Sequence, residues 1–231
     1  MRLIITLLLT ATLTSAGAQQ IIRSLDAHKS PAADLVLFAF GSDNPVKIGT
    51  VDANGNLSTD LSLVQLPEMA AGTREMFISE LRNVFHFSCG NSNDFGQQGG
   101  VPSVRGGNVA LLVNNEWTGS FFLVSDKELK AWLEDPGYNS AVRGLFWDII
   151  YADADVSINL NCSNGIHLED GIAEVSYEYD LELKKGFNWV EYSIEDIHVT
   201  DPEIMASFPS KVRISNMSDQ DKMKWMAEYF F

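Results

Sequence analysis

Short apolar runs separated by turn residues recur along almost the whole chain, and this pattern predicts β-strands. The run 34–40 is nearly continuous and ends at Gly-Ser-Asp-Asn-Pro, as expected for a strand buried on both faces. The stretch 90–107 is rich in glycine and has no periodicity, which predicts a long loop. Further strands are expected over 108–113, 118–124 and 145–160.

Asn54-Gly55 is the strongest two-residue signal for a β-hairpin, because both central positions of a type I′ turn need positive φ. A two-residue turn there pairs Ile48 with Leu61 and gives the hairpin one apolar and one polar face. Turn chemistry and hydrophobic pattern therefore agree on this register.

A second hairpin is expected around Lys185-Gly186. A two-residue turn pairs Leu181 with Val190 and leaves Trp189 on the outer face, beside acidic residues. A three-residue loop with a bulge would instead turn Trp189 inward. The first register is preferred because it gathers the apolar residues on one face, and the second remains an alternative.

Two short helices are expected beside the strands. The segment 126–134 places apolar residues on one side, and 218–230 begins with a serine N-cap followed by helical apolar spacing. No internal repeat or linker divides the chain. The expected fold is therefore all-β, one antiparallel β-sandwich of immunoglobulin-like or related type with two small helical additions.

The N-terminus has the layout of a secretory signal peptide. Met1-Arg2 carries a positive charge, residues 3–9 form an apolar run, and Ala16-Gly17-Ala18 offers a small-residue cleavage site. The apolar run is shorter than the roughly 20 residues of a membrane span, and a buried strand or helix is the alternative. The sequence predicts a signal peptide over 1–18, no lipid anchor or membrane span, and a single secreted or periplasmic domain over 19–231.

The chain has two cysteines, Cys89 and Cys162. In an oxidising compartment an isolated pair predicts one disulfide bond, and each cysteine is placed at the end of an expected strand. Two separate buried thiols are an equal alternative, because sequence does not fix the geometry that a disulfide needs. Neither cysteine has a second Cys or His at zinc-ligand spacing.

Three segments together resemble a group of known sequences. Tyr-x-Asp-x-Asp-Val at 151–156 precedes Tyr-Asp-Leu-Glu-Leu-Lys-Lys-Gly-Phe-Asn at 179–188, and Gly-Thr-Val-Asp opens an earlier hairpin at 49–57. This set is similar to exported bacterial β-rich proteins of uncharacterised activity, many of them lipoproteins. The chain departs from them by Phe187 in place of a tryptophan, by the missing lipidation cysteine, and by Cys162 near a usual glycine. The resemblance implies a secreted β-rich fold and supplies no substrate or catalytic residue.

The charge balance excludes one class of partner. Sixteen Lys and Arg stand against 31 Asp and Glu, a formal net charge of −15, so no nucleic-acid partner is expected. The chain contains no Gly-x-Ser-x-Gly elbow, Walker loop or Gly-x-Gly-x-x-Gly, and its four histidines follow no zinc spacing. His86, between two phenylalanines, is expected to be half-buried without a function.

Calcium is the one cofactor with a local signal. Asp52 with the asparagines that follow it, and Asp153 with Asp155, place oxygens at alternate positions, as hard-cation sites do. Asp and Asn also dominate tight turns for backbone reasons, and this explanation is preferred. No cofactor is therefore expected, with calcium at these three aspartates as the alternative.

The candidate binding site is Trp189 with Glu182 and Glu191, because an exposed ring beside carboxylates suits a glycan. The leading hypothesis is an exported non-enzymatic binding or structural module, with a glycan or an envelope protein as its partner. The alternative is a secreted carbohydrate-active hydrolase whose carboxylates converge only in three dimensions.

Overall fold

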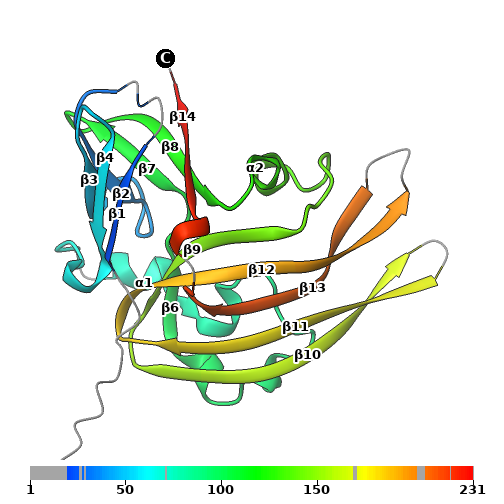
Figure 1. Ribbon diagram of the computed structural model, residues 1–231. Helices are drawn as coiled ribbons and strands as arrows, with labels where there is room; N and C mark the ends of the chain where they lie inside the picture. The colour runs from blue at the N-terminus through cyan, green and yellow to red at the C-terminus, as the bar shows by residue number, and fades with distance from the viewer. Residues whose placement is uncertain are drawn as a thin grey trace, which may run out of the picture.

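The computed structural model describes residues 20–25, 28, 30–70, 72–168, 171–201, 206–218 and 220–230, and the expected signal peptide lies outside them. The chain is mostly β, and its strands form one hydrogen-bonded sheet (Figure 1). The sheet is bent into two groups of strands that run across each other. The expected all-β, sandwich-like fold is confirmed, although the sheet does not close.

The first group has the strand order β1-β4-β3-β2-β7-β8, and β14 also pairs with β8. Its strands are β1 (Gln20–Ser24), β2 (Ala33–Leu37), β3 (Val46–Val51), β4 (Asn56–Asp60), β7 (Val109–Val113), β8 (Glu116–Val124) and β14 (Lys224–Tyr229).

The second group has the order β6-β9-β12-β13-β11-β10, and β5 pairs with β6. Its strands are β5 (Ser79–Glu80), β6 (Pro102–Arg105), β9 (Gly144–Ala152), β10 (Val156–Leu168), β11 (Gly171–Leu183), β12 (Gly186–Asp201) and β13 (Ala206–Asn216). The helices are α1 (Thr73–Phe77) and α2 (Lys127–Glu134), and single 3-10 turns are η1 (Leu61–Leu63), η2 (Leu81–Asn83), η3 (Ser92–Phe95), η4 (Gln98–Gly100) and η5 (Gln220–Lys222).

The two groups meet between β8 and β9, which share a single residue pair, Val124 with Phe146. Away from this pair the strands diverge, because each takes another partner. β8 pairs with β7 from Phe121 back to Glu116, and β9 pairs with β6 from Ile150 to Ala152. The chain that links β6 to β7 crosses the gap, where the Gly106 N–H donates to the Ile149 carbonyl at 2.6 Å. The gap leaves room for a pocket inside the sheet.

Two apolar cores lie on opposite faces of β9. Successive side chains of a strand point to opposite faces, so Trp147 and Ile149 pack toward the first group of strands, while Phe146 and Ile150 face away from it. The core on the Phe146 and Ile150 side is called the second core, and it is covered by α2 and by the segment 81–101. This segment stands where a second sheet would lie in an ordinary sandwich.

The chain reversal at Lys185-Gly186 is not a hairpin, so both expected registers are wrong. β13 lies between β11 and β12, antiparallel to β12 and parallel to β11, which makes the sheet mixed rather than purely antiparallel. The side chain of Asn216 closes the end of this inserted strand: it accepts from the Glu182 N–H at 2.6 Å and donates to the Glu182 carbonyl at 3.0 Å. Asn188 bonds both backbone groups of Lys184 and so holds the wider reversal in place.

The hairpin at Asn54-Gly55 exists, but its register is one residue away from the expected one, since Val51 pairs with Leu57. Gly55 has a φ of 82°, whereas Asn54 is not among the residues with positive φ. Asp52 explains the difference, because its Oδ1 accepts the N–H of Asn54 at 2.8 Å and that of the residue after Gly55 at 2.9 Å. An Asx turn thus favours a three-residue loop.

The helix expected over 126–134 is confirmed as α2, and the Asp126 side chain caps it by accepting the Glu128 N–H at 3.0 Å. The helix expected over 218–230 is not formed. Most of that segment is β14, which pairs along β8 from Lys224–Val124 onward. Pairing with an available strand outweighs a local helical pattern, because propensity is a weak preference. The expected loop 90–107 likewise contains β6.

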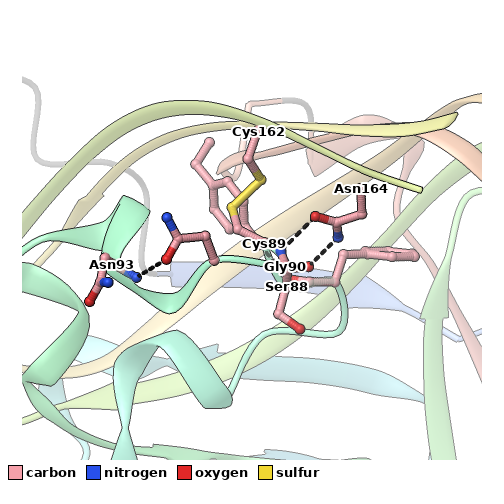
Figure 2. The surroundings of a disulfide bond; sticks show 9 residues. Ser88, Cys89, Gly90, Asn93, Cys162 and Asn164 are labelled. Carbon is pink, nitrogen blue, oxygen red and sulfur yellow. Dashed lines mark hydrogen bonds between the residues drawn. A yellow bond between two sulfur atoms is a disulfide. The ribbon is translucent and has the colours of Figure 1, made fainter. Parts of the chain in front are cut away.

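Cys89 and Cys162 form the expected disulfide bond, with their Cα atoms 5.8 Å apart (Figure 2). Neither cysteine ends a strand, because residues 84–87 form turns and bends and Cys162 lies in the middle of β10. Asn164, two residues along β10, accepts the Gly90 N–H at 2.5 Å. The disulfide and this hydrogen bond fasten the segment 81–101 over the second core.

Candidate functional site

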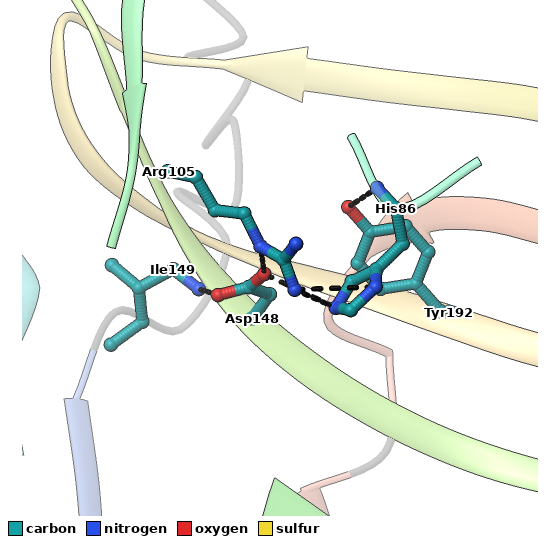
Figure 3. Close-up of polar contacts among 5 residues, drawn as sticks. All are labelled: His86, Arg105, Asp148, Ile149 and Tyr192. Carbon is teal, nitrogen blue, oxygen red and sulfur yellow. Dashed lines mark hydrogen bonds and ion pairs between the residues drawn. The ribbon is translucent and has the colours of Figure 1, made fainter. Parts of the chain in front are cut away.

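Three polar side chains converge where β8 and β9 diverge (Figure 3). Arg105 comes from the end of β6, Asp148 from the middle of β9, and His86 from the covering segment 81–101. The Arg105 Nε donates to Asp148 Oδ2 at 2.6 Å, and the His86 Nε2 lies 3.5 Å from the same oxygen. The Arg105 Nη2 contacts the imidazole ring of His86.

Asp148 is a carboxylate in the middle of a buried strand, with a side chain only 6% exposed. A buried charge needs partners, and both oxygens have them. Oδ2 accepts from Arg105, and Oδ1 accepts the N–H of Ile149 at 2.8 Å. The ion pair therefore fixes the guanidinium of Arg105 at the mouth of the gap.

His86 is neutral at neutral pH. Burial lowers the pKa of its imidazole from 6.5 to about 4, the Asp148 carboxylate opposes the shift, and the Arg105 cation adds to it. The ring packs edge-on against Phe146 and Tyr192, with centroids 4.9 and 5.3 Å away. Burial also raises the pKa of the Tyr192 hydroxyl, which accepts the backbone N–H of His86 at 3.4 Å.

A pocket of about 340 Å³ opens beside these side chains, within the roughly 300–1,000 Å³ of small-molecule sites. Its polar lining includes Arg105, Asp148 and Asn108. Its apolar lining includes Phe122, Leu133 and Phe146.

The chain matches no protein family, no curated protein and no solved structure. Over the described residues, no helix is long and apolar enough to span a membrane.

Trp189 does not form the exposed platform expected from the sequence. Its side chain is 3% exposed and packs edge-on against Trp225, with ring centroids 6.1 Å apart. The reason is topological: β12 pairs with β9 and β13, and the face that carries Trp189 is covered by the first group of strands. The tryptophan with a largely exposed side chain is instead Trp117, at 54%.

Glu191 and Glu182, the carboxylates expected beside Trp189, lie apart in two environments. Glu191 is buried and accepts from the Trp147 Nε1 at 3.0 Å and from the Ser218 hydroxyl at 2.8 Å. Glu182 is exposed on β11, where it accepts from the Ser157 hydroxyl at 2.5 Å. The structure does not bring the three expected site residues together.

Glu191→Ala should therefore lower the free energy of unfolding by about 2 kcal/mol, because the buried Trp147 Nε1 loses its acceptor and the Ser218 hydroxyl loses a partner. Glu182→Ala, the matched control on the surface, should stay within about 0.5 kcal/mol of the parent protein. Urea unfolding at neutral pH measures both. Equal losses in the two variants would contradict the structural role of Glu191.

The three aspartates considered for calcium are each engaged by donors. The Asp52 carboxylate accepts from the Asn56 side chain and from backbone N–H groups of its own turn, and these hydrogen bonds lower its pKa. Asp153 lies 3.0 Å from the Arg74 guanidinium, and the Asp155 carboxylate accepts the Lys185 N–H at 2.8 Å. In the part of the chain that the structure describes, no group of three or more His, Cys, Asp or Glu is placed to hold a metal ion.

A glycosidase needs two carboxylates about 5–9.5 Å apart around one sugar. Among the described residues that line the pocket, Asp148 is the only carboxylate. A second hollow of about 360 Å³ lies over β10, β11, β12 and β13, and its lining includes Glu178 and Glu195. Glu195 is paired with Lys211 at 2.7 Å, and Arg213 lies 3.8 Å from Glu178. A cation beside a carboxylate favours the ionised form, whereas a general acid has to be protonated.

Sequence reasoning missed Arg105 and Asp148 as site residues and assigned no function to His86. The available signal was Asp148, a charge inside the apolar strand 145–152. Such a residue is seldom buried unless it is paired. Its partners could not be found from sequence, because they lie 43 and 62 positions away along the chain.

Proposed function

We propose that this protein is an exported, non-enzymatic binding module whose pocket at His86, Arg105 and Asp148 takes a neutral carbohydrate. The observation that carries the proposal is a pocket that is balanced in charge and lined by both polar and apolar side chains. The sequence-based hypothesis of a glycan partner is kept, and its site moves from Trp189 to this pocket.

The charges around the pocket favour an uncharged ligand. Arg105 and Asp148 cancel each other, and the imidazole of His86 is neutral at neutral pH. The chain as a whole carries −15, so its field repels anions at long range. A ligand with many hydroxyl groups can donate to carboxylate and carbonyl oxygens and accept from the guanidinium and Asn108 without bringing a charge.

The mixed lining of the pocket suits the two kinds of surface that a sugar ring presents. A pyranose has an apolar face of C–H groups and a rim of hydroxyls. Phe122, Leu133 and Phe146 offer apolar contacts, and Arg105 and Asn108 offer polar groups. Small-molecule sites have this composition in general, with a few polar groups fixing the orientation.

Export is inferred from the N-terminal signal sequence and from the disulfide bond, which persists in oxidising compartments. Both secretion and a periplasmic location fit these observations. Either location would give the module access to glycans of the cell envelope.

A glycan array with a parallel glycosidase panel tests the proposal. The protein should bind one class of neutral glycan, and Asn108→Ala should weaken binding about tenfold, the effect of one lost hydrogen bond of about 1.4 kcal/mol. Trp117→Ala is the matched control, because it removes an exposed side chain outside the pocket and should leave affinity unchanged. Binding that is lost in Trp117→Ala and kept in Asn108→Ala would contradict the site, and turnover of any substrate would contradict the non-enzymatic role.

A further inference from the structure

β10 is the last strand of the second group and pairs with one neighbour, β11 (Figure 1). All of its 13 residues pair with β11 in an unbroken register, from Val156–Leu183 to Leu168–Gly171. Among the described residues, none makes a backbone hydrogen bond to its outer edge. The edge is therefore long, regular and open.

The hydrogen bonds of Glu182 show which backbone groups of β10 point outward. Both backbone groups of Glu182 bond to Asn216, on the β13 side, so they point away from β10. In an antiparallel ladder, two facing residues direct their N–H and C=O groups either toward each other or away from each other. These two cases alternate along the strands. Ser157, which faces Glu182, therefore directs its N–H and C=O to the outer edge, as does every second residue after it. The outward set is Ser157, Asn159, Asn161, Ser163, Gly165 and His167.

This edge lacks the devices that keep sheets from pairing with other chains. Natural edge strands are shortened, bulged, or protected by lysine, proline or inward charges. β10 contains no Lys, Arg, Asp, Glu or Pro over 156–168, in a chain that is 20% charged. The disulfide at Cys162 also holds the strand to the covering segment, so its shape is fixed before any partner arrives.

We infer that β10 pairs antiparallel with β10 of a second copy of this chain, across a twofold axis. Two chains of −15 repel each other over most of their surfaces, and an uncharged strand is where they can meet without placing like charges opposite each other. Leu160 and Ile166 are only partly buried at the edge of the second core, and the pairing covers them further. A twofold axis suits such a contact, because the same strand serves both partners.

Sedimentation equilibrium of the mature protein, with and without one proline substitution, tests the inference. The parent protein should show twice the mass of one chain at high concentration. Ser163→Pro should show the mass of one chain, because it removes an outward N–H and leaves the β10–β11 hydrogen bonds intact. Its far-ultraviolet spectrum reports whether the variant folds.

A second pair of variants covers the case in which Ser163→Pro does not fold. Ser163 faces Ser176 on β11, so Ser163→Lys and Ser176→Lys add the same charge to neighbouring strands, once at the edge and once inside the sheet. Ser163→Lys should abolish the doubled mass, and Ser176→Lys should keep it. A parent protein with the mass of one chain at all concentrations would overturn the inference, as would a doubled mass that both Ser163 variants retain. An extended peptide as the true occupant of the edge would give the first of these results.

Discussion

Replacing both Cys89 and Cys162 by serine is expected to lower the free energy of unfolding by about 4 kcal/mol. The bond closes a loop of 73 residues, and the chain-entropy model assigns a value of this size to such a loop. This is a large share of the roughly 5–15 kcal/mol by which domains are stable. Urea unfolding of the parent and the double variant measures the difference.

The loss should also appear locally, because the disulfide fastens the segment 81–101 over the second core. Phe85 and Phe95 of that segment stack on each other and pack against Tyr179 of β11. Without the bond, amide hydrogens of this segment should exchange faster than those of the first group of strands. An unchanged unfolding midpoint, or two alkylatable thiols in natively exported protein, would contradict the disulfide account.

Acidification from pH 6.5 to pH 4 is expected to cost about 3 kcal/mol of stability through His86 alone. Its pKa is about 4 in the folded protein and near 6.5 in the unfolded chain. In this window the unfolded chain binds a proton that the folded protein does not, so stability falls as the pH falls. Below about pH 4 both states are protonated, and the contribution levels off.

The His86→Gln variant isolates this effect, because glutamine is polar and does not titrate. The difference in unfolding free energy between the parent and His86→Gln should shift by about 3 kcal/mol between pH 7 and pH 4, to the disadvantage of the parent. His167→Gln, which removes an imidazole from the surface of β10, is the matched control. Parallel pH profiles for the parent and His86→Gln would contradict the half-buried, neutral state of His86.

Local signals in the sequence predicted the elements of this fold better than their neighbours in the sheet. The Asp126 cap and the apolar side of 126–134 act within one turn of chain, and α2 forms as expected. The turn at Asn54-Gly55 also forms, but the side chain of Asp52 shifts its register by one residue. Within a few residues, chemistry decides the outcome.

The errors concern pairings between distant parts of the chain. The local sequence pattern around Lys185-Gly186 favours a hairpin. In the structure β13, about 25 residues further along the chain, lies between the two strands that would form it. Trp189 turns inward for the same reason, and the helix expected over 218–230 yields to pairing with β8. Which strands pair with each other depends on contacts between distant residues, and the local pattern of one sequence does not determine these contacts.

The pocket depends on the same long-range pairings. It exists because β8 and β9 share one pair and then diverge, and because Arg105 and His86 reach Asp148 from two other segments. The charge at Asp148 inside an apolar strand was visible in the sequence. That it lines a pocket was not, since the gap arises only when β6, β7, β8 and β9 meet.

Backbone amide chemical shifts, titrated with the neutral glycan that binds best on an array, test the proposed binding site most directly. We predict saturable shifts at the amides of 107–109, 122–123 and 148–149, which surround the pocket, and none around Trp117 on the outer face of the first group. Shifts that centre on Trp117, or the absence of any saturable shift, would contradict the account.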